Sequence, residues 1–283
     1  MRAAVRARGL RFAYPDGHVA LDGLDLEVAR GERVAVLGPN GAGKTTFMLH
    51  LNALLSGHGE LEVDGLRVGR DPVADVRARV GLVFQDPDDQ LFMPTVREDV
   101  AFGPNNMGLS REEVAARVRE AMAAVRMSGV AARAPHHLSM GQRRRVAVAT
   151  VLAMRPGLLV LDEPSANLDP RSRRELCEVL AEVRTTMLVV THDLPLAAQL
   201  CPRAVILSGG RIAADGPCRE VLGDAALLAA HDLELPAGFD LSLVRPHLPF
   251  PTREPPPPPA PAAGRGPAGA PAPRRPARSA ARS

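Results

Sequence analysis

Alternating apolar and polar residues near the start of the chain predict two paired strands. Residues 5–13 alternate weakly and end at the turn signal Tyr14-Pro15-Asp16-Gly17, and residues 20–28 alternate again. Residues 33–37 then form a short apolar run. We therefore expect an antiparallel hairpin layer that precedes a buried strand.

Later patterns predict a helical segment followed by buried strands. Residues 110–127 begin with the capping-box pair Ser110 and Glu113 and carry apolar residues at helical spacing. Residues 158–161 and 187–190 are continuous apolar runs, which are typical of parallel strands covered on both faces. The predicted fold class is α/β, with a β layer at the front and a helical insertion at approximately residues 86–153.

A phosphate-loop motif lies between the apolar run at 33–37 and a helix-like run at 46–55. It has the spacing G-x-x-x-x-G-K-[ST], and its glycines let backbone N–H groups point at phosphate oxygens. Lys44 adds a positive charge, Thr45 offers a hydroxyl to Mg²⁺, and the following helix directs its dipole at the phosphates. An accidental Gly-rich turn is the alternative, but the strand-turn-helix context predicts a nucleoside triphosphate site. The expected contacts are Gly38, Pro39, Asn40, Gly41, Ala42, Gly43, Lys44, Thr45 and Thr46.

The composition predicts a folded cytosolic protein without a membrane-spanning segment or a signal peptide. The 283 residues are 46% hydrophobic, enough for a real core, yet no apolar run approaches the about 20 residues that cross a bilayer. The N-terminus lacks the apolar stretch of a signal peptide. The three cysteines are isolated and odd in number, which indicates a reducing, cytosolic compartment.

The basic charge belongs to the C-terminal tail. Residues 251–283 contain six Arg and one Glu, a net charge of +5, so residues 1–250 carry −2 of the total of +3. The tail is rich in Pro, Ala and Arg and has too little apolar bulk to order itself, so we expect it to be disordered. Its role stays open between a tolerated extension and a binding arm, and no nucleic-acid partner is expected.

Five more motifs follow the phosphate loop in a fixed order. They are Gln85, Leu138-Ser139-Met140-Gly141-Gln142, Asp162-Glu163-Pro164, residues 165–169 and Thr191-His192-Asp193. They resemble the glutamine loop, signature motif, second nucleotide-binding motif, aspartate loop and histidine switch of ABC-type ATPases. The resemblance covers about residues 5–235 and implies a P-loop NTPase cassette with a RecA-like core, an antiparallel β layer and a helical subdomain. We expect the cassette at residues 1–240, an extension at 241–250 and the tail at 251–283.

The motifs assign roles in ATP hydrolysis. Asp162, at the end of a buried strand, can hold Mg²⁺ together with Thr45 and Gln85. Glu163 is placed to polarise water and is the general base that the resemblance implies. The resemblance makes His192 a γ-phosphate contact, and Gln85 and Lys44 complete the catalytic set. The alternatives are a solvated Asp-Glu pair and a structural histidine.

The signature motif implies a dimer. Ser139, Gly141 and Gln142 begin a helix whose N-terminus can bind an anion, and in the family this end closes on ATP held by a second cassette. Met140 replaces the first glycine of the usual pair. Because Ser139 and Gly141 are retained, we expect this change to be tolerated, and slower closure is the alternative. The basic run at 143–145 is expected to be a solvated or interdomain face.

Tyr14 is the expected adenine contact. It is the only tyrosine of the chain, and the resemblance places an aromatic ring that stacks on the base at this position. The alternative is a simple turn residue beside Pro15.

Residues 83–104 most resemble the A component of energy-coupling-factor importers. Residues 135–139, 149–154 and 231–236 are most similar to the cobalt/nickel branch. This resemblance implies a second cassette, identical or paralogous, a transmembrane coupling subunit that docks near residues 86–104, and a separate substrate-binding membrane subunit. The expected location is the cytoplasmic face of the cell membrane.

Several alternatives are kept. A vitamin importer of the same type is the nearest, and a soluble non-transport ABC ATPase or a small-molecule P-loop kinase is more distant. Adjacent His136 and His137 diverge on a helix and have no ligand partners in the sequence, so no transition-metal site is expected here.

Overall fold

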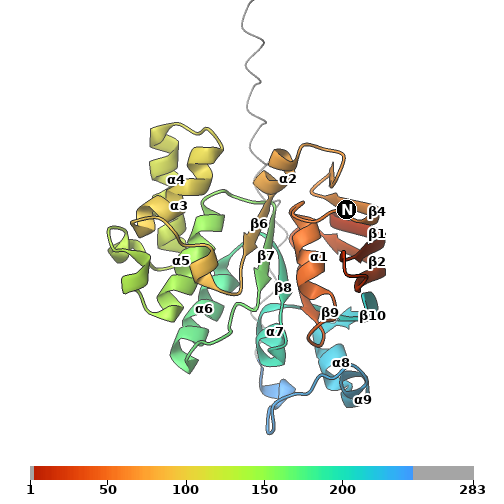
Figure 1. The fold of residues 1–283 in the computed structure, drawn as a ribbon. Helices are drawn as coiled ribbons and strands as arrows, with labels where there is room; N and C mark the ends of the chain where they lie inside the picture. Colours follow the sequence, from red (N-terminus) through yellow and green to blue (C-terminus); the bar gives the residue numbers. More distant parts are fainter. Residues whose placement is uncertain (1–2, 245–283) are drawn as a thin grey trace, which may run out of the picture.

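The computed structural model describes residues 3–244 and contains two β-sheets (Figure 1). The smaller sheet has the strand order β2-β1-β4-β5 and is antiparallel throughout. Its strands are β1 (Ala3–Ala13), β2 (Val19–Ala29), β4 (His58–Val63) and β5 (Leu66–Arg67). The pairing of β1 with β2 confirms the hairpin that the alternation predicts.

The larger sheet has the order β10-β9-β3-β8-β7-β6. All neighbours are parallel except β10 with β9. Its strands are β3 (Arg33–Leu37), β6 (Val80–Val83), β7 (Leu158–Asp162), β8 (Thr186–Val190), β9 (Arg203–Ser208) and β10 (Arg211–Pro217). Because β8 lies between β3 and β7, the carboxyl ends of these three strands meet at one edge of the sheet.

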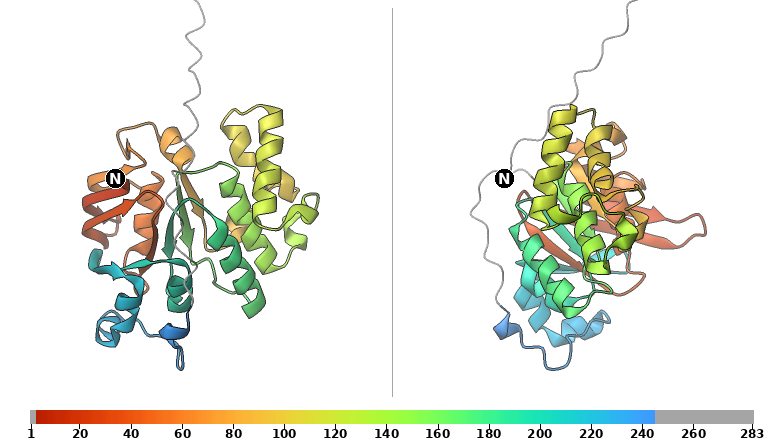
Figure 2. Two further views of the ribbon diagram at one scale, coloured as in Figure 1. Left: turned by 180° about the vertical axis from the view of Figure 1, so that it is seen from behind. Right: turned by 90° about the vertical axis from the view of Figure 1, so that its left-hand side faces the viewer.

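Helices cover this sheet and form a separate group at one end. Figure 2 shows the helical group around α3 to α5 on one side of the core and the antiparallel sheet on the other. The α-helices are α1 (Lys44–Leu51), α2 (Val73–Arg79), α3 (Val96–Asn106), α4 (Arg111–Ala124), α5 (Met140–Leu152), α6 (Pro170–Glu182), α7 (Leu194–Leu200), α8 (Cys218–Gly223) and α9 (Ala225–Ala230). Short 3-10 turns occur at Pro87–Asp89, Ser128–Val130, Pro135–His137 and Leu241–Leu243.

Side chains from the two faces of the larger sheet enter two different cores. Val34 and Val36 of β3 pack with α1 and the antiparallel sheet, whereas Ala35 and Leu37 pack with the helices on the opposite face. The strand is therefore apolar at every position between its ends, since both faces are covered. This explains why the continuous runs in the sequence correctly predict β3, β7 and β8.

Capping side chains fix where two helices of the helical group begin. Ser110 and Glu113 form a capping box at α4, as the sequence predicts. Ser139 and Gln142 form another at α5, whose first residues carry the signature motif. The start of α5 is therefore locally determined.

The three cysteines lie in the core. Cys177, Cys201 and Cys218 are buried and free. Burial raises the pKa of Cys177 to about 11 and that of Cys218 to about 12, and it raises the pKa of Cys201 as well. All three are therefore neutral thiols at physiological pH.

The described part of the chain contains no membrane span. Among residues 3–244, no helix combines the length and the apolar character needed to cross a bilayer. The tail expected at 251–283, and the part of the extension beyond residue 244, lie outside the described residues.

Candidate nucleotide site

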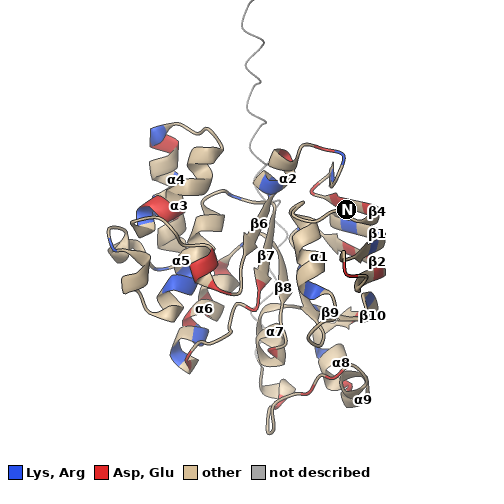
Figure 3. Cartoon of the chain, viewed as in Figure 1, with Lys and Arg blue, Asp and Glu red and all other residues tan. Residues whose placement is uncertain are grey.

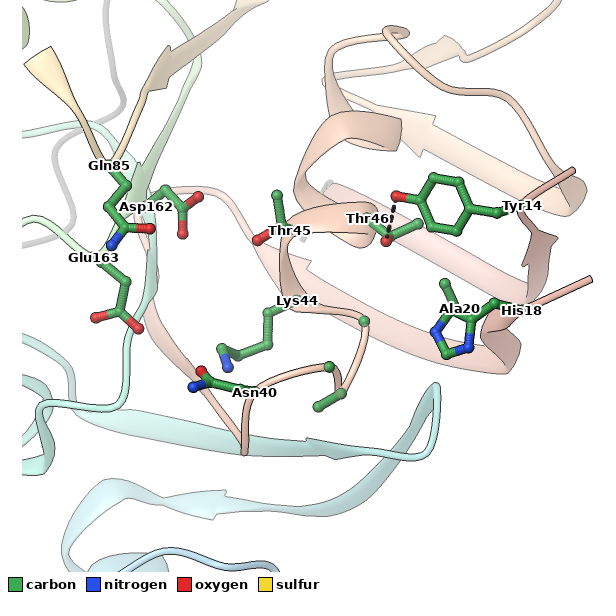
Figure 4. A pocket seen from close by; sticks show the side chains of 13 residues that line it. Tyr14, His18, Ala20, Asn40, Lys44, Thr45, Thr46, Gln85, Asp162 and Glu163 are labelled. Carbon is green, nitrogen blue, oxygen red and sulfur yellow. Dashed lines mark hydrogen bonds between the residues drawn. The ribbon is translucent and has the colours of Figure 1, made fainter. Parts of the chain in front are cut away.

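A cavity of about 270 Å³ opens where the phosphate loop meets the carboxyl ends of β6 and β7. Figure 4 shows Gln85, Asp162 and Glu163 on one wall, Tyr14 and His18 on the other, and the phosphate loop between them. The lining residues are Tyr14, His18, Ala20, Asn40, Gly41, Ala42, Gly43, Lys44, Thr45, Thr46, Gln85, Asp162 and Glu163. The structure thus brings together most of the site residues that the sequence predicts.

The phosphate loop has the backbone conformation that its glycines permit. Gly38 has a φ of 151° and Gly43 a φ of 101°. A Cβ atom on Gly38 would lie 2.1 Å from the carbonyl oxygen of Leu207, and one on Gly43 would lie 2.3 Å from that of Ala20. Only glycine fits at these two positions without moving the backbone.

Lys44 is buried at the start of α1 and is held by its own loop. Its Nζ donates hydrogen bonds to the carbonyl oxygens of Gly38, at 2.7 Å, and Pro39, at 2.9 Å. Neither Gly38 nor Pro39 lines the cavity, so they contribute to the site through these carbonyls. Burial lowers the pKa of Lys44, and the carboxylates of Glu163 and Asp162 oppose that shift.

Asp162 faces the phosphate loop from the end of β7. Figure 3 shows the acidic end of β7 opposite the basic start of α1. Burial and the neighbouring charge of Glu163 raise the pKa of Asp162 to about 6, although Lys44 and Arg144 oppose the shift. The buried carboxylate is therefore costly to ionise unless a cation accompanies it.

The residues present fit a bound magnesium ion. Thr45, Gln85 and Asp162 line the same cavity and offer hydroxyl, amide and carboxylate oxygens, which are the ligands that Mg²⁺ prefers. A divalent cation would also offset the burial cost that raises the pKa of Asp162. Among residues 3–244, no group of three or more His, Cys, Asp or Glu side chains is arranged to hold a metal.

Glu163 is fixed by donors from the end of β8. Its Oε1 accepts hydrogen bonds from the backbone N–H of His192, at 3.0 Å, and from the ring Nδ1 of His192, at 2.7 Å. Its Oε2 accepts a hydrogen bond from the hydroxyl of Thr191 at 2.9 Å. Glu163 also has a left-handed φ of 42°, which a non-glycine residue rarely adopts. His192 is thus placed against the carboxylate of Glu163 and is not itself part of the cavity lining.

Tyr14 stands at the far end of the cavity. Its hydroxyl is 3.0 Å from the hydroxyl of Thr46, and the ring of Phe12 packs perpendicular to it with centroids 5.0 Å apart. Its ring is therefore positioned before any base arrives. His18 lies beside it, with ring centroids 6.4 Å apart and planes inclined by 17°, and Figure 4 shows the two faces turned the same way.

The signature residues lie apart from this cavity. Ser139, Gly141 and Gln142 begin α5 in the helical group and are absent from the lining. Gly141 packs closely on α6, since a Cβ atom there would lie 2.5 Å from the hydroxyl of Ser172. Their contact with nucleotide across a dimer therefore stays a prediction, as does the effect of Met140.

Sequence reasoning missed several residues of the site. His18 and Ala20 line the cavity without belonging to a motif. Thr191 donates a hydrogen bond to Glu163, and its position directly before His192 was the available signal for this role. The expected solvated face at 143–145 is wrong for Arg144 and Arg145, which are buried. The interdomain alternative holds for Arg144, whose guanidinium joins α5 to loops of the core sheet.

Comparisons with known proteins agree with this arrangement. The sequence model of the ABC transporter family matches residues 21–166. An ABC transporter ATP-binding protein of Streptomyces coelicolor is 63% identical, with the match covering 86% of this chain and 94% of the relative. The energy-coupling factor transporter ATP-binding protein EcfA of Methanothermobacter thermautotrophicus is 48% identical, covering 84% of this chain and 78% of the relative.

Solved structures show the same fold. The cbiO1 protein of Clostridium perfringens, described as part of the ABC transporter complex cbiONQ, has a TM-score of 0.73 and 34% identity, covering 83% of this chain and 97% of that chain. The ATP-binding cassette MJ0796, solved as a dimer in a post-hydrolysis state with ADP and Pi, has a TM-score of 0.67 and 26% identity, covering 76% and 99%.

Proposed function

Because this chain belongs to the ABC transporter family as an ATP-binding protein, we propose that it hydrolyses ATP to drive an energy-coupling-factor importer. The observation that carries the proposal is the position of Glu163. Its carboxylate lines the same cavity as Lys44 and Asp162 and is held by Thr191 and His192. A carboxylate fixed beside the expected γ-phosphate is what activation of a water molecule requires.

The residues of the cavity divide the work. Lys44 and the N–H groups of the phosphate loop bind the β- and γ-phosphates, and the start of α1 adds its dipole. Glu163 accepts a proton from the attacking water, and His192 orients Glu163. The ring of His192 lies outside the cavity lining, so its proposed contact with the γ-phosphate requires the ring to move towards the bound nucleotide. Thr45, Gln85 and Asp162 would hold Mg²⁺, which supplies charge neutralisation on the phosphate oxygens. Tyr14 stacks on adenine.

The assignment of the base is tested by Glu163→Gln. The amide cannot accept the proton, so turnover should fall by roughly 100-fold or more, whereas equilibrium binding of ATP should be retained. Lys44→Ala is the matched variant, because it should weaken ATP binding itself. Wild-type turnover in Glu163→Gln would contradict the role of the base, and unchanged ATP affinity in Lys44→Ala would contradict the phosphate site.

A second cassette, identical or paralogous, is part of the proposal. Ser139, Gly141 and Gln142 begin a capped helix that lies outside the cavity of its own chain, so they are available to a nucleotide held by another copy. ATP that binds between two such surfaces would favour the closed pair over the open one. Analytical ultracentrifugation of Glu163→Gln should show ATP-dependent dimers, and an ATP-saturated monomer would refute an identical partner.

The helical group offers a surface for the transmembrane coupling subunit. Phe92 and Phe102 have 62% and 42% of their surface exposed, and their rings pack perpendicular with centroids 5.0 Å apart. Exposed aromatic pairs of this kind are characteristic of protein interfaces. Changing both residues to Ser should abolish co-purification with the membrane subunits while basal ATPase activity persists, and retained co-purification would move the docking site elsewhere.

The proposed cargo is cobalt or nickel, taken up by a separate substrate-binding membrane subunit while this chain sits on the cytoplasmic face. Residues 135–139 and 231–236 resemble that branch, and the structural relative cbiO1 belongs to a complex named cbiONQ. Uptake assays of the assembled complex with labelled Co²⁺, Ni²⁺ and vitamins would identify the transported substrate. Vitamin uptake without metal uptake would support the alternative importer.

A further inference from the structure

Arg144 is a fully buried charged residue on α5. Only 1% of its surface is exposed, and it is the largest side chain of the described residues that is buried to this degree. Burial lowers the pKa of its guanidinium, and the carboxylates of Asp86 and Asp162 oppose the shift. Its Nε has no hydrogen-bond partner among residues 3–244. Burying a charged side chain costs folding free energy, and an apolar side chain at this position would pack with less cost.

The guanidinium joins three segments that carry nucleotide motifs. Nη1 donates to the carbonyl oxygen of Phe84, at 3.0 Å, and to that of Gln85. Nη2 donates to the carbonyl oxygen of Ala166 at 3.2 Å. Phe84 and Gln85 follow β6, Ala166 follows β7, and α5 itself begins at the signature motif. The planar fork of an arginine can reach both loops at once, which a lysine ammonium cannot do with the same geometry.

We propose that Arg144 is a positioning residue that locks the loop of Gln85 against the loop of Ala166 and so holds the Gln85 side chain at the magnesium site. The inference rests on the proposed role of Gln85 as a magnesium ligand. Because the hydrogen bonds go to the backbone of Gln85, the side-chain amide stays free to face the cavity, which it lines. Loss of the guanidinium would leave these part-buried carbonyls without their donor, and the loop of Gln85 would shift to satisfy them.

Arg145 provides a matched control on the same helix. It is also buried, with 9% of its surface exposed, and its guanidinium pairs with Glu175 of α6. It makes no hydrogen bond to either loop that Arg144 joins. Arg144→Met and Arg145→Met therefore remove comparable buried arginines, but only the first releases the loop of Gln85.

The test is an equilibrium measurement of ATP affinity with Mg²⁺ and with EDTA, in the full-length protein carrying Glu163→Gln so that no ATP is consumed. The affinity with Mg²⁺ divided by the affinity with EDTA reports the contribution of the metal to ATP binding. Arg144→Met should reduce this ratio roughly fivefold or more, which corresponds to a loss of about 1 kcal/mol in the free energy that the metal adds to ATP binding. Arg145→Met should leave the ratio unchanged even if it lowers the melting temperature as much, and Arg144→Lys should fall in between.

Gln85→Ala separates the two possible failures. If Gln85→Ala reduces the ratio and Arg144→Met does not, the inference about Arg144 is wrong while the magnesium site stands. If Gln85→Ala itself leaves the ratio unchanged, the metal role of Gln85 is wrong and the proposal for Arg144 falls with it. An equal reduction in Arg144→Met and Arg145→Met would also overturn the proposal, since it would mean a general loss of packing. If Arg144→Met is unfolded, the comparison of Arg144→Lys with Arg145→Lys replaces it, and a ratio equal in those two variants would refute the role.

Discussion

Replacement of Thr191 by Val tests how the catalytic carboxylate is held. The hydroxyl of Thr191 is buried, donates a hydrogen bond to Oε2 of Glu163 at 2.9 Å and accepts one from the backbone N–H of Asp193 at 3.0 Å. Val has nearly the same shape but no hydroxyl. The substitution therefore removes both hydrogen bonds and leaves the remaining contacts of the side chain in place.

The magnitude follows from these two hydrogen bonds. A hydrogen bond to a charged group contributes about 1.5–3 kcal/mol, and a buried N–H left without a partner costs about 1–3 kcal/mol. The N–H of Asp193 is only part-buried, so the second cost lies near its lower end of about 1 kcal/mol, and we expect the free energy of unfolding to fall by about 2.5–4 kcal/mol. If about 1.4 kcal/mol of the first contribution is lost in the transition state, kcat falls roughly tenfold. KM for ATP should stay unchanged, because Thr191 is not part of the cavity lining.

The assay is steady-state ATPase activity together with urea unfolding, on Thr191→Val and Thr191→Ser. Ser keeps the hydroxyl and should retain most of kcat, although its smaller side chain lowers stability. Circular dichroism at the assay temperature would show that both variants are folded. A wild-type kcat in Thr191→Val would refute the idea that this hydroxyl positions Glu163, and an equal loss in both variants would assign the effect to packing.

Three further predictions concern the cavity. Without added Mg²⁺ or nucleotide at pH 8, Asp162→Asn should raise the free energy of unfolding by about 2–3 kcal/mol, because the native pKa of about 6 lies above the value of the unfolded chain. This gain should vanish below about pH 4, where the carboxyl is protonated in both states, and denaturant titrations at the two pH values would check it. Gly38→Ala should lower the melting temperature far more than Gly41→Ala. A Cβ on Gly38 would collide with the carbonyl oxygen of Leu207, whereas a Cβ on Gly41 would have no atom within 4 Å. His18→Ala should weaken ATP binding roughly fivefold, because the ring loses its contact with the nucleoside, and should leave tripolyphosphate binding unchanged. An equal loss of affinity for both ligands would place His18 at the phosphates instead.

Local patterns predicted the elements of this fold because their causes are local. The continuous apolar runs predicted β3, β7 and β8, since strands covered on both faces contain little else. The capping pair at Ser110 predicted the start of α4 in the same way.

The missed residues depend on contacts between distant segments. Arg144 is buried because its guanidinium meets carbonyls that lie 60 and 22 residues away, and no local pattern shows that. His18 enters the cavity wall through the path of the loop between β1 and β2, which alternation does not determine. Motif spacing found Lys44, Asp162 and Glu163, but the hydrogen bonds that hold Glu163 required the adjacency of β7 and β8.

The buried cysteines make this chain a convenient background for site-directed labelling. Cys177, Cys201 and Cys218 are shielded from solvent and their raised pKa values keep thiolate scarce, so maleimides should react with the folded protein slowly. A cysteine engineered at exposed Ser139 would then be the fast-reacting thiol of the described residues. A fluorophore placed there would report directly, by its change in emission, whether a second molecule covers that turn when ATP is added.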